Sequence, residues 1–123
     1  KSQTAHLSWS SQGRGFFLPD LLTKKIEADI TASETWRKPG ENSSGPLSCF
    51  DSIENRKRKN RATILASKLK TTCQNIAGAW PLNQNFPSFA LIGPRSIEEI
   101  DSSLINLDIN LNSDEVNWLN LSD

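Results

Sequence analysis

The sequence predicts an α/β fold in which parallel strands are joined by helices. Two short apolar segments, residues 5–9 and 86–93, are typical of strands, and two helical patterns separate them along the chain. A strand that returns through helices to a second strand forms a βαβ unit, which is parallel and almost always right-handed. With 123 residues, the chain suits one domain.

The first strand is expected at AHLSW, residues 5–9, where apolar side chains alternate with polar ones. The second is FPSFALIG, residues 86–93, a dense apolar run bounded by Pro87 and Gly93. Two parallel strands leave both sheet edges open and need cover on both faces. We therefore expect the chain to require neighbouring structure that it does not contain.

Helices are expected at residues 51–69, from residue 71 onward, at 96–107 and close to the C-terminus. Pro81 should kink or end the second of them. Residues 18–50 are rich in Pro, Gly and Ser, which predicts a long loop. Each helix start carries a capping-box pattern: Asp51 with Glu54, Thr71 with Gln74, Ser96 with Glu99, and Asn112 with Glu115.

Composition limits the classes of function. Fourteen basic and fourteen acidic side chains cancel, so no overall field favours nucleic acid or a membrane surface. A hydrophobic content of 36% is low for a self-sufficient core. No apolar stretch approaches the ~18–20 residues of a membrane span, and the first residues do not resemble a signal peptide.

Few side chains suit metal or nucleophilic chemistry. Cys49 and Cys73 stand far apart, and His6 is the single histidine, so we expect no metal site, no disulfide framework and a cytoplasmic setting. His6 is expected to be a packing or surface residue, and no Ser/His/Asp or Cys/His nucleophile set can be assembled. The chain has no methionine and no tyrosine and begins with Lys1, which suggests a fragment of a longer protein.

Two glycine-containing loops follow the two predicted strands. In SSQGRG, residues 10–15, two glycines flank Arg14, which suits either a tight turn or a backbone that approaches an anion. In IGPRSIEE, residues 92–99, the loop opens a helix whose N–H groups can receive an anion beside Arg95. The alternative is an ordinary capped helix with a solvated arginine, because two acids in its first turn already satisfy the dipole.

The basic run NRKRKNR, residues 55–61, could contact nucleic acid, but it lies on an amphipathic helix whose outer face must be solvated. We therefore expect no nucleic-acid partner. The sequons at Asn42 and Asn120 are expected to be chance matches, since no secretory signal accompanies them.

Taken together, the chain resembles the C-terminal part of the aldo-keto reductases, a family of (β/α)8 barrels that reduce carbonyl groups with NADPH. The resemblance covers nearly the whole chain. Four stretches carry it: WSSQGRGFF (9–17), CFDSIENRKRKNRA (49–62), PLNQNFPSFALIGPRSIEEIDSSL (81–104) and LDINLNSDEVNWLNL (107–121). It implies that residues 1–123 are one partial domain holding the last two strands of the barrel, their helices and a C-terminal helix.

The resemblance also implies a cofactor site. Trp9 would stack on the nicotinamide, and residues 18–50 would form a long loop over the cofactor. The pyrophosphate would be lined by Ser10, Gln12, Gly13 and Arg14. The adenosine 2′-phosphate would be held by Gly93, Pro94, Arg95 and Ser96, with Ser103 near the adenine. Barrel enzymes place phosphates in the loops after strands seven and eight.

Three positions depart from the family pattern: Glu99 replaces arginine or glutamine, Ser103 replaces asparagine, and Pro81 interrupts a usually continuous helix. The first two leave the choice between NADPH and NADH open. The family's catalytic tyrosine, lysine, aspartate and histidine would lie in an N-terminal half that is missing here, so no catalytic residue is expected in this chain. The other interpretation is a truncated, non-catalytic binding or interaction protein.

Overall fold

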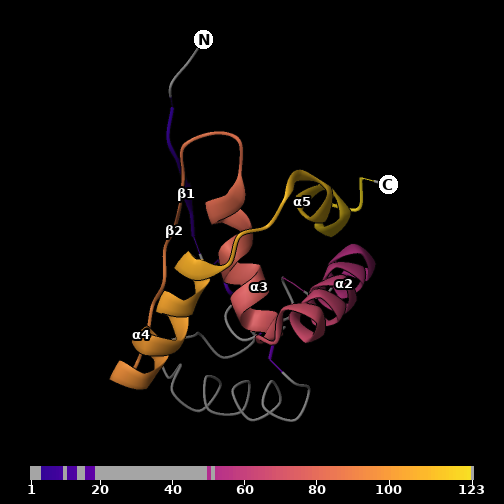
Figure 1. The fold of residues 1–123 in the computed structure, drawn as a ribbon. Coiled ribbons are helices and arrows are strands. Elements are labelled where there is room, and N and C mark those ends of the chain that lie inside the picture. The colour runs from indigo at the N-terminus through magenta and orange to yellow at the C-terminus, as the bar shows by residue number, and fades with distance from the viewer. Residues whose placement is uncertain (1–3, 10, 14–15, 19–49, 51, 123) are drawn as a thin grey trace, which may run out of the picture.

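The computed structural model describes residues 4–9, 11–13, 16–18, 50 and 52–122 of the chain (Figure 1). In these residues, four α-helices and two 3-10 helices accompany two short parallel strands, which form an open α/β arrangement. The strands and α4 lie along one side of the molecule, and α2 and α5 lie along the other, with α3 between them (Figure 1). The predicted α/β class is confirmed at this level. The long loop predicted at residues 18–50 falls almost wholly outside the described residues.

The sheet consists of β1 (His6–Ser8) and β2 (Ser88–Ala90), which run parallel with Leu7 beside Phe89. Backbone hydrogen bonds extend the pairing at both ends, from the His6 N–H to the Pro87 carbonyl (2.8 Å) and from the Leu91 N–H to the Ser8 carbonyl (3.0 Å). Both strands are shorter than the segments 5–9 and 86–93. Pro87 has no N–H to donate, and the chain leaves the ladder after Leu91.

Helix α2 (Ile53–Leu69) begins at Ser52, whose side chain accepts a hydrogen bond from the Asn55 N–H. The prediction of Asp51 as the N-cap was wrong by one residue, and Asp51 itself lies outside the described residues. Ser and Asp are comparable caps, so two adjacent candidates cannot be separated by type alone. The helix ends at Lys70, which adopts a left-handed backbone with φ of 55°.

Helix α3 (Cys73–Ala79) also begins one residue later than predicted, because Thr72 and not Thr71 accepts a hydrogen bond from the Asn75 N–H. The Thr71–Gln74 capping box is therefore not formed at this helix start. Pro81 has the predicted effect: the α-helix ends at Ala79 and continues as the 3-10 helix η2 (Trp80–Asn83). A proline is tolerated there because the first turn of a helix has no partner for its N–H.

Helix α4 (Ile97–Leu104) is capped by Ser96, as predicted, and runs into the 3-10 helix η3 (Ile105–Asp108). The reciprocal half of its capping box differs, since the Glu99 carboxylate accepts from the N–H of Arg95. Helix α5 (Ser113–Leu119) has the complete capping box that the sequence predicts, formed by Asn112 and Glu115. Both predicted helices are thus confirmed with their N-caps.

The hydrophobic core lies among the helices and receives no residue from the described strands. The Asn83 side chain connects the end of α3 to the segment between η3 and α5. Its amide nitrogen donates to the carbonyls of Ala79 (2.9 Å) and Ile109 (3.0 Å), and its amide oxygen accepts from the Leu111 N–H (3.0 Å). These bonds fix the turn between η3 and α5 against η2. The core consists of Ala62, Leu65, Ala66, Ile76, Ala79, Leu111, Val116 and Leu119.

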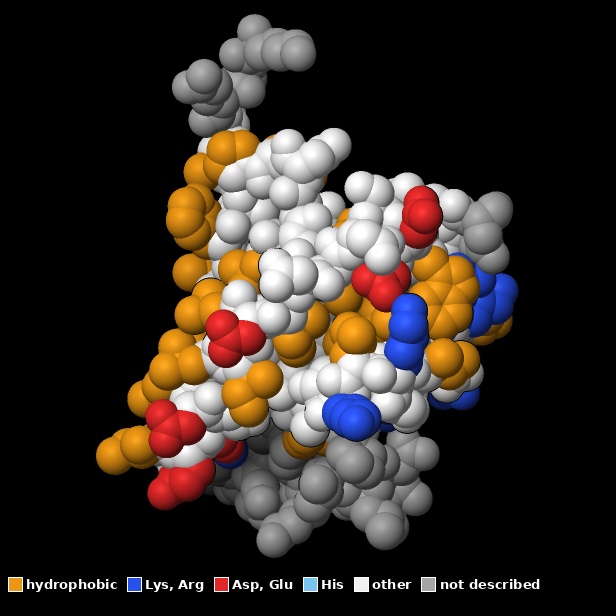
Figure 2. Space-filling model, in the orientation of Figure 1, with side chains coloured by type: hydrophobic (Ala, Val, Ile, Leu, Met, Phe, Trp, Pro, Cys, Tyr) orange, Lys and Arg blue, Asp and Glu red, His pale blue; other side chains and the backbone are white. Residues whose placement is uncertain are grey.

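The side of the molecule formed by β1, β2 and α4 exposes many apolar side chains, which Figure 2 shows as a band of hydrophobic surface. Leu7 and Phe89, neighbours in the sheet, are 61% and 53% exposed, and no residue of α4 is buried. We call this band the apolar side. The exposed large apolar residues of these elements and of the segments that follow the strands are Leu7, Trp9, Phe89, Leu91, Ile92, Ile97, Ile100 and Leu104. Among the described helices, none has both the length and the apolar character to cross a membrane.

Candidate functional site

The parallel pairing brings the two predicted loops to the same edge of the sheet, because the carboxyl ends of parallel strands lie side by side. The loop after β1 also forms hydrogen bonds with the residue that follows β2 and with α4. The Ser11 hydroxyl donates to the Leu91 carbonyl (3.3 Å), and the Gln12 amide donates to the Ser103 hydroxyl on α4 (3.3 Å). The structure therefore joins segments that are 80 and 91 positions apart in sequence.

The loop after β1 turns at Gly13, which is buried and has a positive φ of 63°. Phe16 closes the turn by donating its N–H to the Gly13 carbonyl (2.9 Å). A side chain at residue 13 would both strain the backbone and meet Phe16 and Phe17 at 3.2 Å. Gly13 is thus required for the shape of this loop, whatever the loop binds. Ser10 and Arg14 lie outside the described residues.

Lys59 of α2 holds the far end of this loop. Its ammonium donates to the Leu18 carbonyl (2.9 Å) and lies 5.4 Å from the centroid of the Phe16 ring, which is itself buried. A cation over an aromatic face is an attractive contact. Lys59 belongs to the basic run 55–61, so at least one charge of that run has an intramolecular role.

Trp9 directly follows β1 and is 76% exposed. It lies at the carboxyl end of β1, at the start of the loop that follows this strand. An exposed aromatic ring beside the carboxyl ends of the strands is available to stack on a planar ligand.

The loop after β2 carries Gly93, Pro94, Arg95 and Ser96, which are all exposed. A side chain on Gly93 would meet nothing within 4 Å, so this part of the loop is open. The Ser96 hydroxyl accepts from the Glu99 N–H (3.3 Å), while the Glu99 carboxylate accepts from the Arg95 N–H (2.6 Å). One donor of the predicted anion site is therefore already paired with an acid of the chain.

A second acid adds to this negative charge. Hydrogen bonds from its own backbone N–H and from Ser96 lower the pKa of Glu98, which is exposed. Glu98 therefore remains ionised at neutral pH. Any anion that binds at this helix start must compete with two carboxylates.

The sequence did not reveal three contributors to this region. Gln74 donates from its amide to the Gln12 amide oxygen (3.4 Å), Ser11 binds Leu91, and Lys59 binds the loop after β1. Gln74 had been predicted only as part of a helix cap. No local pattern could have shown these contacts, since each joins segments that are distant in sequence.

Among the described residues, the other reactive side chains do not assemble into a catalytic group. His6 hydrogen bonds Ser88 across the sheet (3.2 Å) and meets the edge of Phe86, so it supports strand pairing. Burial raises the pKa of the Cys73 thiol, with smaller opposing effects from Thr63 and Lys59. Within the described residues, no three His, Cys, Asp or Glu side chains lie close enough to hold a metal ion.

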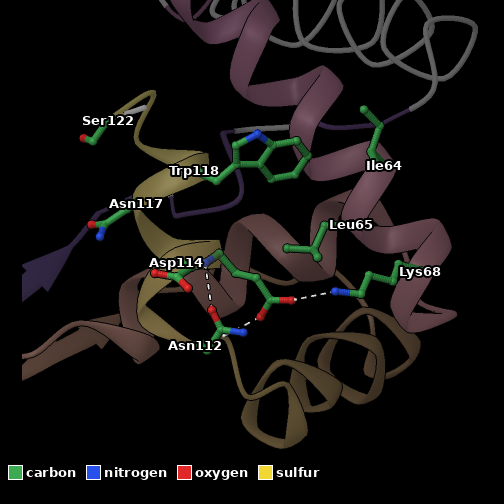
Figure 3. A pocket seen from close by; sticks show the side chains of 9 residues that line it. Ile64, Leu65, Lys68, Asn112, Asp114, Asn117, Trp118 and Ser122 are labelled. Carbon is green, nitrogen blue, oxygen red and sulfur yellow. Dashed lines mark hydrogen bonds and ion pairs between the residues drawn. The ribbon is translucent and has the colours of Figure 1, made fainter.

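A groove of about 630 Å³ lies between α2 and α5, and it contains none of the predicted site residues (Figure 3). The ion pair between Lys68 and Glu115 (3.2 Å) crosses it, and the Trp118 ring lies on its other side near Ile64. Arg61 holds Trp118 by donating to its carbonyl and lying 5.4 Å from its ring. The lining residues are Ile64, Leu65, Lys68, Asn112, Asp114, Glu115, Asn117, Trp118 and Ser122.

The fold and the candidate site define a small α/β protein with two loops joined at one edge of a parallel strand pair. No family model matches the chain, and no curated protein matches it.

Proposed function

We propose that this chain is the cofactor-binding end of an NADP(H)-dependent carbonyl reductase of the aldo-keto reductase type, formed by the last two strands of a (β/α)8 barrel. The observation that carries the proposal is the meeting of the loops after β1 and β2 through the Ser11–Leu91 hydrogen bond, beside the Gln12–Ser103 bond that joins the first loop to α4. Barrel enzymes bind phosphates in the two loops after strands seven and eight.

In this proposal the loop after β1 binds the pyrophosphate and the loop after β2 binds the adenosine 2′-phosphate. Ser10 and Arg14 would supply polar contacts to the pyrophosphate, and Gly13 would allow the backbone its close approach. Gly93, Pro94, Arg95 and Ser96 would surround the 2′-phosphate. The open space at Gly93 and the exposed ring of Trp9 are compatible with these roles.

When bound, the nicotinamide would supply a hydride to the carbonyl carbon of a small substrate. The role of this chain is to hold the cofactor, with Trp9 against the nicotinamide ring. The proton for the carbonyl oxygen would come from the catalytic tyrosine of the other part of the barrel, since this chain contains no tyrosine.

The apolar side supports the proposal of a partner that completes the barrel. Both edges of the β1–β2 pair are unpaired in the described structure, and the face bearing Leu7 and Phe89 is exposed. Parallel sheets occur almost only with both faces covered. The partner proposed is the N-terminal half of the same barrel, which would add strands to the sheet and helices beside α4.

Glu99 sets a condition on the cofactor. A 2′-phosphate at the Arg95 N–H would have to displace the Glu99 carboxylate, because both are anions that use the same donor. We therefore expect Glu99→Gln to raise the affinity for NADPH by roughly tenfold and to leave the affinity for NADH nearly unchanged.

Titration of tryptophan fluorescence with NADPH and with NADH, alongside circular dichroism, tests the proposal. We expect saturable quenching that is greatly reduced in Trp9→Phe and retained in the matched variant Trp118→Phe, whose ring lies in the α2–α5 groove. Arg95→Gln should weaken NADPH binding alone, with Lys57→Gln as the control. A folded chain that shows no saturable quenching with either cofactor would refute the proposal.

That last outcome would favour a second candidate, a non-catalytic binding or interaction protein. The exposed apolar side is the specific observation in its favour, because contiguous apolar surface marks sites of protein association. Such a protein would bind its partner through the apolar side and would bind no ligand at the loops after β1 and β2.

A further inference from the structure

The side-chain amide of Gln12 uses both of its polar atoms within the protein. Its oxygen accepts from Gln74 of α3 at 3.4 Å, and its nitrogen donates to Ser103 of α4 at 3.3 Å. All three side chains are partly buried. Gln12 therefore links the loop after β1 to two helices, and each of its two polar atoms bonds a side chain of the protein.

The direction of this hydrogen-bond chain follows from where the structure places the nitrogen and oxygen atoms of the two amides. An amide nitrogen can only donate and an amide oxygen can only accept, whereas a hydroxyl can do both. Gln74 is therefore the donor to Gln12, and Gln12 is the donor to Ser103. Because the Ser103 oxygen accepts here, its own proton must point elsewhere. The described residues provide no acceptor for it.

We propose that Gln74 is a positioning residue of the dinucleotide site. By fixing the orientation of the Gln12 amide, it makes the Ser103 hydroxyl a hydrogen-bond donor toward an acceptor atom of the cofactor's adenosine part. This inference rests on the proposed function. Ser103 shares a helix face with Ser96 and Glu99, at spacings of seven and four residues, so the donor lies on the face of α4 that begins at the loop after β2.

The substitution Gln74→Glu tests the direction of the chain, because a carboxylate can only accept. The Gln12 amide would then turn over and donate to residue 74. Its oxygen would accept from the Ser103 hydroxyl, whose proton would no longer be available to a ligand. The link between loop and helices would survive, but the donor to the ligand would be lost. We expect NADPH affinity to fall by about fivefold to tenfold, as for the loss of one hydrogen bond.

A double-mutant cycle separates this mechanism from simple repulsion by the new charge. Ser103→Ala should lower the affinity to a similar extent, and Gln74→Glu should have no further effect in that background. Ser103→Thr, which keeps the hydroxyl, should restore binding. Additive effects of Gln74→Glu and Ser103→Ala would overturn the proposal. Asn117→Asp places the same charge change on α5, outside the site, and serves as the control.

A measurement without ligand distinguishes failure of this inference from failure of the proposed function. In NMR spectra of the free chain, the side-chain amide resonances of Gln12 should shift, and their exchange with solvent should quicken, in Gln74→Leu. If these signals are unchanged, Gln74 does not orient Gln12, even where the wild-type chain binds NADPH. If they change while the wild type binds neither cofactor, the orientation stands and the dinucleotide function fails.

Discussion

The carboxamide of Asn106 in η3 packs directly against Gly78 of α3, and both residues are buried. A β-carbon on residue 78 would lie 2.8 Å from the Asn106 Cγ and closer still to its Nδ2. The absence of a side chain at Gly78 is therefore what lets η3 approach α3. This contact fixes the position of the segment that follows α4.

We expect Gly78→Ala to destabilise the protein by about 1–3 kcal/mol, since the buried Asn106 must move out of a packed position. Urea denaturation followed by circular dichroism measures the change. Gly93→Ala is the matched control, because a β-carbon there meets nothing within 4 Å. Equal midpoints for the two variants would contradict this account of Gly78.

Asn83→Ala should cost about 1–3 kcal/mol of stability, because it removes three hydrogen bonds to the backbone and leaves partly buried groups without those partners. The comparison is Asn110→Ala, whose exposed side chain makes one long bond to the Asp108 carbonyl at 3.4 Å. Thermal unfolding of both variants under the same conditions measures the difference. A loss as large in Asn110→Ala would show that Asn83 has no special role.

The cap of α5 should matter more than the ion pair beside it. Asn112→Ala removes the side-chain acceptor of the capping box and should cost about 0.5–2 kcal/mol. Lys68→Gln breaks the ion pair with Glu115, and because Lys68 is largely exposed we expect a loss of only about 0–0.5 kcal/mol. Chemical denaturation of both variants provides the test, and the reverse order of the two losses would refute the prediction.

Cys73 should react slowly with thiol reagents, because burial raises its pKa and thereby reduces the thiolate fraction. The rate of alkylation at pH 8, measured in a Cys49→Ser background, should be below that of glutathione.

A raised pKa of Cys73 in the folded state also means that stability is retained below the unfolded pKa of about 8.5 and declines as pH rises above it. Cys73→Ala should lessen this decline, and an unchanged decline would contradict the prediction.

Much of the local structure was predictable because its causes are local. Pro81 ends an α-helix through its own ring and missing N–H, and the Asn112–Glu115 capping box needs only two residues three positions apart. The N-caps observed at Ser52 and Thr72 also depend on local sequence, although the residue predicted as the cap was a different one in each case. Each prediction placed the cap one residue early, beside a neighbour able to fill the same role.

The candidate site was predictable only in part, because its geometry depends on contacts across the whole chain. The sequence indicated that Gly93 and Arg95 lie in a loop, but not that the Glu99 carboxylate takes the Arg95 N–H. The resemblance implied that Gln12 contacts the cofactor, which stays a prediction, and the structure adds that its amide bonds Gln74 and Ser103. The hydrogen-bond partners of these side chains are determined by how β1, α3 and α4 pack together.

The absence of strand residues from the described core has a consequence for the order of folding. Helices α2 and α3 follow each other directly in sequence and α5 reaches α2 across 47 and 57 positions, whereas β1 must find β2 across 82 positions. Closing so long a loop costs conformational entropy and slows the step that requires it. We therefore expect α2 and α3 to form the early, stable unit, and β1 to join last and leave first. The edge that bears Trp9 and Gln12 opens with β1, so local opening exposes the candidate site before the helices unfold.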